Sequence, residues 1–139
     1  MKKQIIIWLF LFVSLFVFGC VSTPPFDQAE YERAITLKID ALSLLGNANK
    51  NFHLYQSDVS KVKKDMLFML EYAKNKPNNE ECITLWEKMI DPDGLLLGNI
   101  LKEWELRGVL DDTYAQGLSK IISDRFDDII ELLRKRVKK

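Results

Sequence analysis

The chain has 139 residues, with 20 basic and 20 acidic side chains and two cysteines. This length suits one ordinary domain that can bury its own core. The balanced charge excludes a polycation and therefore argues against nucleic acid as the main partner.

The first part of the chain has the layout of an export signal. A positive Met-Lys-Lys start precedes residues 5–18, which are all apolar except Ser14. A membrane-spanning helix needs about 20 apolar residues, whereas the apolar part of a secretory signal takes about 7–15. We therefore expect residues 1–19 to be a cleaved signal peptide. The alternative is a short N-terminal membrane anchor that is never cleaved.

A cysteine stands at the boundary where the apolar run ends. The sequence Val17-Phe18-Gly19-Cys20 resembles the lipobox of bacterial lipoproteins, in which an aliphatic, a variable and a small residue precede an invariant cysteine. The resemblance implies that signal peptidase recognises Val17, Gly19 and Cys20 and cuts before the cysteine. It also implies a diacylglycerol on the Cys20 sulfur and a further fatty acid, such as palmitate, on the new N-terminus. Phe18 departs from the pattern, since that position usually holds a small or β-branched residue. The alternative is that Cys20 is simply a small residue after a signal peptide.

A short tether follows the expected lipid anchor. One acyl chain binds a membrane only marginally, and two or three chains on one cysteine make the anchoring stable. Six residues separate Cys20 from Asp27, and at about 3.3–3.6 Å per residue they span about 20 Å. We therefore expect a tether over residues 20–26 and one domain over residues 27–139, held close to a bilayer of the bacterial cell envelope. If the source is Gram-negative, Val21 after the cysteine favours the periplasmic face of the outer membrane, by the sorting preference of that family.

Loss of the leader changes the charge and the cysteine count. The mature chain would have 120 residues, with 18 basic and 20 acidic side chains, and so a net charge of −2. With Cys20 lipidated, Cys82 is the one remaining thiol, so no internal disulfide can form. Cys82 lies three residues before Leu85 on an apolar helical face, and we expect it to be buried.

The mature chain reads as helical throughout. No stretch alternates with period two for long, and prolines occur only at 24, 25, 77 and 92. Asp27 with Glu30 makes a capping-box-like start for the first helix, and Ser57 is the expected N-cap of the second. The expected apolar stripes of these two helices are Tyr31, Ile35, Ile39, Leu42 and Leu45, and then Val59, Val62, Met66, Met69, Leu70 and Ala73.

Three more helices follow. Asn79 is the expected cap of the third helix, Gly108 the C-cap of the fourth and Asp111 the start of the fifth. Their apolar stripes are Cys82, Leu85, Trp86, Met89 and Ile90; Leu97, Ile100, Leu101 and Trp104; and Leu118, Ile122, Phe126, Ile129 and Leu133. Short loops between such helices predict an all-α fold, a compact antiparallel bundle of about four to five helices.

Motifs for catalysis or metal binding are missing from the sequence. His53 is the one histidine and lies 29 residues from Cys82, with no nucleophile motif around it. Asp91 and Asp93 resemble the start of a calcium loop, but position twelve of that loop would be Lys102 instead of glutamate. We therefore expect no enzyme activity, no cofactor and no metal. Five large side chains fall in line with leucines at helical spacing and are expected in the core instead of a binding surface: Trp86, Trp104, Met66, Met69 and Met89.

The C-terminus is strongly basic. Five of its last six residues are cations: Arg134, Lys135, Arg136, Lys138 and Lys139. They suit the negative end of the last helix and keep it soluble. A second interpretation is contact with anionic lipid head groups, worth about 1 kcal/mol per basic residue. A third is coupling of the terminal Lys139 to cell-wall peptide, as in the major bacterial outer-membrane lipoprotein, which also ends in lysine.

These observations favour a binding role over catalysis. The first hypothesis is a membrane-anchored accessory module that docks an envelope protein and exposes an apolar patch for it. The second is a small-ligand carrier or enzyme, which needs an enclosed pocket of about 300–1,000 Å³ between the helices. The third is an exclusion or immunity lipoprotein that blocks an incoming toxin, phage or plasmid system.

Overall fold

The computed structural model of the protein describes residues 24–138, and within them it is all-helical, with no strand. The five helices are α2 (Gln28–Leu45), α3 (Gln56–Lys74), α4 (Glu80–Ile90), α5 (Leu97–Arg107) and α6 (Asp112–Lys135). Short 3-10 turns cover Phe52–Leu54 (η1) and Arg136–Lys138 (η2). None of the helices in this described part is long and apolar enough to cross a membrane.

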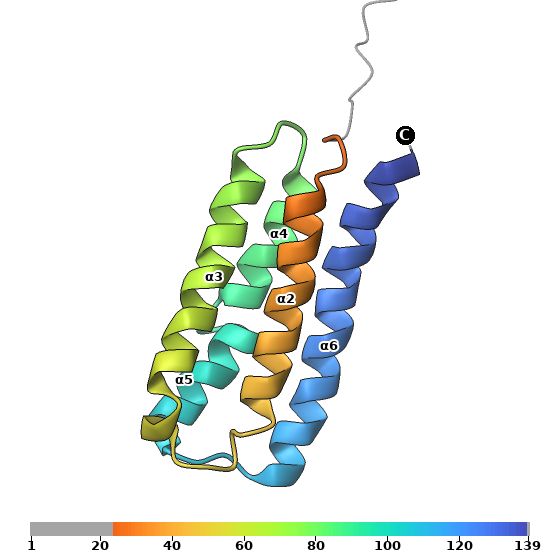
Figure 1. Cartoon of the computed structure of the whole chain (residues 1–139). Helices are drawn as coiled ribbons and strands as arrows, with labels where there is room; N and C mark the ends of the chain where they lie inside the picture. Colours follow the sequence, from red (N-terminus) through yellow and green to blue (C-terminus); the bar gives the residue numbers. More distant parts are fainter. Residues whose placement is uncertain (1–23, 139) are drawn as a thin grey trace, which may run out of the picture.

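The helices form an antiparallel bundle of four rods (Figure 1). The two short helices α4 and α5 follow each other along one rod, and the turn of residues 91–96 separates them. Helix α2 packs against α3 and α6, and α4 closes the ring by packing against α3 and α6 as well. This arrangement confirms the predicted all-α antiparallel bundle. Because the number of rods is even, the described chain starts and ends at the same end of the bundle.

Several helix ends form where the sequence predicts them. The Asp27 carboxylate accepts a hydrogen bond from the Glu30 N–H, and the Asp111 carboxylate does the same for Tyr114. Gly108 ends α5 with a φ of 76°, a left-handed conformation that costs glycine no steric strain. The second helix differs from the prediction: it begins at Gln56 instead of after Ser57, because the η1 turn leads directly into its first turn.

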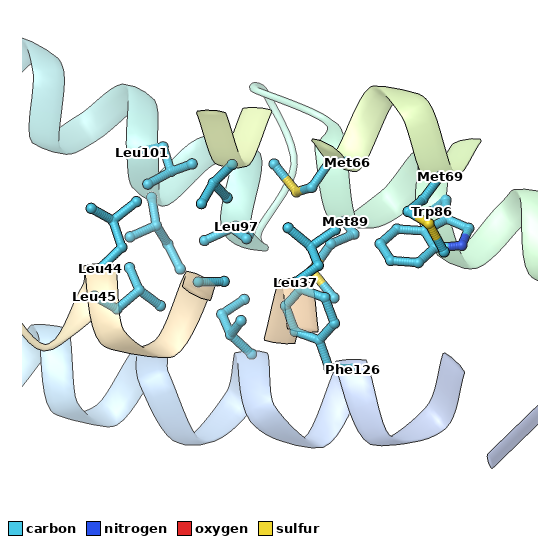
Figure 2. Packing of buried hydrophobic residues seen from close by; sticks show 14 of the residues in the cluster. Leu37, Leu44, Leu45, Met66, Met69, Trp86, Met89, Leu97, Leu101 and Phe126 are labelled. Carbon is cyan, nitrogen blue, oxygen red and sulfur yellow. The ribbon is translucent and has the colours of Figure 1, made fainter. Parts of the chain in front are cut away.

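The core lies between the four rods and contains the expected large side chains (Figure 2). All six residues of the predicted stripe on α3 are buried, and both Trp86 and Trp104 are fully buried. The Trp86 and Phe126 rings meet edge to face, with centroids 6.1 Å apart, and join α4 to α6. The predicted core role of the tryptophans and of Met66, Met69 and Met89 is therefore confirmed.

The buried face of α2 differs in part from the predicted one. Ile39, expected in the core, is 62% exposed, and Ile35 is half-buried. The residues that α2 buries are Glu30, Ala34, Leu37, Ala41, Leu44 and Leu45. Small side chains let α2 approach both neighbouring helices closely, so its core face carries alanines. Of the predicted stripe, Leu45 is buried and Tyr31 and Leu42 pack against the core, so the prediction was wrong at Ile39.

Candidate functional site

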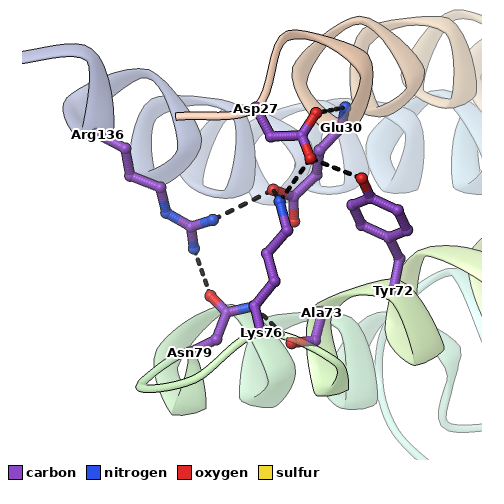
Figure 3. Close-up of polar contacts among 7 residues, drawn as sticks. All are labelled: Asp27, Glu30, Tyr72, Ala73, Lys76, Asn79 and Arg136. Carbon is purple, nitrogen blue, oxygen red and sulfur yellow. Dashed lines mark hydrogen bonds and ion pairs between the residues drawn. The ribbon is translucent and has the colours of Figure 1, made fainter. Parts of the chain in front are cut away.

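The end of the bundle where the described chain begins carries a buried polar cluster (Figure 3). Four segments meet there: the start of α2, the last turn of α3 with the loop after it, the start of α4, and the end of α6. We call the six side chains involved the tether-end cluster: Asp27, Glu30, Tyr72, Lys76, Asn79 and Arg136. The cluster joins every rod of the bundle at this end.

Asp27 holds the outer half of the cluster. One carboxylate oxygen caps α2, and the other accepts hydrogen bonds from the Tyr72 hydroxyl at 2.6 Å and the Lys76 ammonium at 2.8 Å. These two hydrogen bonds, the one from Lys76 first, hold the pKa of Asp27 well below its usual value of 3.8. The same contact with Asp27 raises the pKa of Tyr72. Asp27 is therefore an ionised carboxylate that serves as helix cap and ion-pair partner together.

Glu30 holds the inner half, and its side chain is only 1% exposed. Its Oε2 atom accepts from Lys76 Nζ at 2.8 Å and from Arg136 Nη1 at 3.2 Å. The Arg136 side chain is 6% exposed and also donates to the amide oxygen of Asn79. Asn79 in turn donates to the Ala73 carbonyl oxygen at 2.7 Å. A buried carboxylate flanked by two cations is stable only as a complete set, since a lone buried charge is costly.

Two sequence-based interpretations change at this cluster. Glu30 was assigned to a capping box, yet its carboxylate turns inward to Lys76 and Arg136. Asn79 does precede α4, but its side chain makes no cap hydrogen bond there and binds Ala73 and Arg136 instead. In both cases a stronger partner across the bundle, a cation, replaces the local backbone contact.

The cations of the basic C-terminal segment differ in their surroundings. Arg136 points into the cluster, so its guanidinium already has a carboxylate partner. Arg134 pairs with Glu131 of its own helix at 2.7 Å. Lys135 is exposed and lines a pocket, while the Lys138 side chain and the whole of Lys139 lie outside the described residues. Of the five cations in the predicted lipid-contact set, Arg136 thus has a structural role.

Cys82 lies beneath the cluster and is buried, as the sequence predicted. Burial first, and then the nearby Glu30 carboxylate, raises the pKa of the Cys82 thiol to about 11. A thiol that stays protonated at neutral pH is a poor nucleophile. Cys82 also lines an open pocket of about 260 Å³ together with Pro24, Leu132, Lys135 and Arg136.

The other candidate groups for chemistry do not come together. His53 is exposed in η1, at the opposite end of the bundle from the start of α4, which carries Cys82. The Asp91 carboxylate accepts from the Asp93 N–H at 2.9 Å and so shapes the turn, and Asp93 pairs with Lys102. Within residues 24–138, no group of three or more histidine, cysteine or carboxylate side chains is placed to hold a metal ion.

A second open pocket lies between α2 and α3. It has a volume of about 290 Å³ and is lined by polar groups of Asp40, Ser43, Asn47, Tyr55 and Lys61, among others. Several of these groups satisfy one another: Lys61 pairs with Asp40, and the Tyr55 hydroxyl donates to Asn47. The pocket is open to solvent, whereas a buried small-ligand site encloses most of its ligand.

The tether-end cluster was not predicted from the sequence. Glu30 lies four residues before Ala34 on the face that α2 buries, but the apolar stripe predicted for this helix contains neither residue. A carboxylate on a buried face needs a cation from elsewhere in the fold. One cation that binds Glu30 is Arg136, which lies 106 positions away along the chain. Only the folded structure shows that the two residues meet.

The residues of the lipobox-like motif, Val17, Gly19 and Cys20, lie outside the described residues, as do the expected signal peptide and the first part of the tether. Comparison with known proteins returned no matching family model, no matching curated protein and no matching solved structure.

Proposed function

We propose that this chain is an exported lipoprotein of the bacterial cell envelope that holds a small helical bundle at a membrane surface, where the bundle docks a partner protein. The lipobox-like motif ending in Cys20 supports the anchor. The structure adds one supporting observation: Pro24, which belongs to the tether, and the end of α6 line the same pocket. A chain held by Cys20 would therefore present its basic C-terminal segment to the same bilayer.

The charges at this end decide which residues contribute to such a contact. Lys135 is exposed. We propose that Lys135, Lys138 and Lys139 contact anionic lipid head groups, and each contact contributes about 1 kcal/mol of binding free energy. Arg136 contributes to stability instead, because Glu30 already neutralises it. The proposed placement is the periplasmic face of the outer membrane if the source is Gram-negative.

The opposite end of the bundle supports the docking role. The loops there are fixed by backbone hydrogen bonds from Phe52 to Gly108, at 2.7 Å, and from Leu110 to Ala48, at 2.8 Å. Near these bonds, Leu54 and Leu106 are 75% and 71% exposed. A contiguous apolar patch that includes these side chains would suit a protein contact. With the tether at the other end, these leucines would face away from the membrane.

The anchor is tested by metabolic labelling with palmitate in a bacterial host. We expect the wild-type chain and the Cys82→Ala control to incorporate label, because the buried Cys82 thiol has no part in acylation. The Cys20→Ala variant should incorporate none and should leave the membrane fraction. Label retained on Cys20→Ala would refute the lipid anchor.

A further inference from the structure

Two large apolar side chains are exposed next to each other on α3. Leu67 is 52% exposed and Phe68 is 44% exposed. The guanidinium of Arg33, on α2, lies 4.2 Å from the centroid of the Phe68 ring. Lys64 is exposed one helical turn before this pair, so its side chain is a neighbour of both. We call Arg33, Lys64, Leu67 and Phe68 the α2/α3 patch.

The two cations of this patch differ from the other cations nearby. Lys61 pairs with Asp40 and Asp65, and Lys74 pairs with Glu71. Within residues 24–138, neither Arg33 nor Lys64 forms an ion pair with a carboxylate. The patch therefore combines exposed apolar surface with two cations that form no ion pair within residues 24–138.

Two other exposed apolar residues, Leu106 and Ile39, have different surroundings. Leu106 lies on α5 between Glu105 and Arg107, which pair with Lys63 and Glu103 and so carry no unbalanced charge. Ile39 lies on the outer side of α2, one turn from the uncharged Thr36 and Ser43. Aromatic and aliphatic side chains flanked by free cations are the composition that binds the interface of an anionic membrane.

We propose that the α2/α3 patch lies against an anionic lipid surface, with Leu67 and Phe68 in the head-group region and Arg33 and Lys64 on lipid phosphates. This inference rests on the proposed function, because it takes the chain to be held at a bilayer through Cys20. The distances allow it. Phe68 lies six residues before the end of α3, about 9 Å at 1.5 Å per residue, and the tether spans about 20 Å. The anchored bundle is thus tilted, so that the tether-proximal part of its α2/α3 side meets the bilayer while its far end points away from it.

The burial of Cys82 allows an engineered cysteine on the surface to be labelled selectively. Cys82 is buried and its thiol pKa is raised to about 11, so an engineered exposed cysteine reacts first. Leu67→Cys carries a polarity-sensitive nitrobenzoxadiazole probe in the full lipidated protein, and Leu106→Cys is the matched control. The protein without an engineered cysteine measures background labelling. Circular dichroism verifies that each labelled variant keeps its helix content.

The labelled proteins are placed in vesicles of phosphatidylethanolamine and phosphatidylglycerol, or of phosphatidylcholine alone. We expect the probe at position 67 to shift to shorter wavelength and to be quenched by brominated lipid in the anionic vesicles. We expect no shift and no quenching at position 106. High salt, or Arg33→Gln with Lys64→Gln, should abolish the signal at position 67, because the cations supply the attraction.

Each outcome decides a separate point. Absence of quenching at position 67 in protein that floats with the vesicles overturns the patch while leaving the anchor intact, and points to a protein as its occupant. Equal quenching in neutral vesicles, or no effect of the double substitution, overturns the role of Arg33 and Lys64 and with it the proposal. Protein that fails to float with any vesicle refutes the anchor and the patch together.

Discussion

Glu30 is the residue on which the tether end of the bundle depends. Its carboxylate is buried and binds Lys76 from the α3–α4 loop and Arg136 from the end of α6. Both cations lie at least 46 positions away along the chain. One side chain thus fixes three segments relative to one another, so we expect the cluster to stabilise the packing of the helices at this end.

Glu30→Ala should lower the free energy of unfolding by about 3–5 kcal/mol, because it leaves the buried Arg136 guanidinium without its carboxylate. Glu131→Ala is the matched control, since Glu131 forms an exposed pair with Arg134, and its cost should be about 0–1 kcal/mol. Replacing Glu30 and Arg136 together by Leu and Met should cost less than Glu30→Ala alone. Urea unfolding measures the free energy of unfolding of all three variants. Equal stability of Glu30→Ala and Glu131→Ala would contradict the proposed role of Glu30 in holding the three segments together.

Asp27 gives the bundle a defined acid sensitivity. Its pKa is held below the usual 3.8 by Lys76 and Tyr72, so the folded state prefers the ionised carboxylate. This stabilisation is complete above about pH 5, well above the usual pKa, and is lost progressively as the pH falls toward the lowered pKa of the folded state. Asp27→Asn keeps a capping side chain but removes the charge. We expect the variant to be less stable than wild type at pH 7 and to lose less stability between pH 7 and pH 3.

The matched control for Asp27→Asn is Asp111→Asn. Asp111 also caps a helix, but it forms no ion pair within residues 24–138. Its replacement should leave the acid sensitivity of wild type in place. Urea unfolding at the two pH values gives the four free energies, and parallel losses in Asp27→Asn and wild type would exclude Asp27 as the source.

At the scale of elements, the third rod is divided between α4 and α5. Asp91 ends α4, and α5 restarts at Leu97 beside the end of α4. The contact there is close: a Cβ atom added at Gly98 would lie 1.9 Å from the Ile90 carbonyl oxygen. The carbonyl oxygen is a backbone atom and the Cβ is bonded directly to the Cα, so no side-chain rotation can relieve the overlap.

Gly98→Ala should therefore destabilise the bundle by at least about 3 kcal/mol, near the upper range for overpacked sites. Gly117→Ala is the matched control in another helix, because a Cβ there meets nothing within 4 Å. That substitution should stabilise α6 by about 0.5–1 kcal/mol, the helix propensity difference between glycine and alanine. Thermal unfolding followed by circular dichroism ranks the two, and a harmless Gly98→Ala would show that α5 can shift away from α4.

At the scale of the whole molecule, the two ends of the bundle differ in chemistry. One end carries the ion-paired cluster and the start of the described chain, and the other exposes Leu54 and Leu106. This polarity matches the proposed arrangement, in which the first end is held at the membrane and the second meets a partner. A partner contact at the leucines is independent of the lipid contact proposed for the α2/α3 patch.

Leu54→Ser with Leu106→Ser should abolish capture of the partner by the lipidated protein from envelope extract, since these side chains supply the apolar contact. Ile39→Ser is the matched control: Ile39 is also largely exposed but lies on the side of α2, and capture should persist. Mass spectrometry identifies the captured proteins. An unchanged set with the double variant would move the partner site elsewhere.

The sequence alone determined the helical class, most helix ends and the core faces of α3 to α6. These features depend on local properties: capping side chains, glycine at a left-handed position, and apolar residues repeating every three to four positions. Folding decided what depends on partners far along the chain. It placed the alanines of α2 in the core and left Ile39 exposed, and it turned Glu30, Asn79 and Arg136 away from their local roles. Ion pairs and close backbone contacts form between segments that only the packed bundle brings together, so periodicity within one helix cannot specify them.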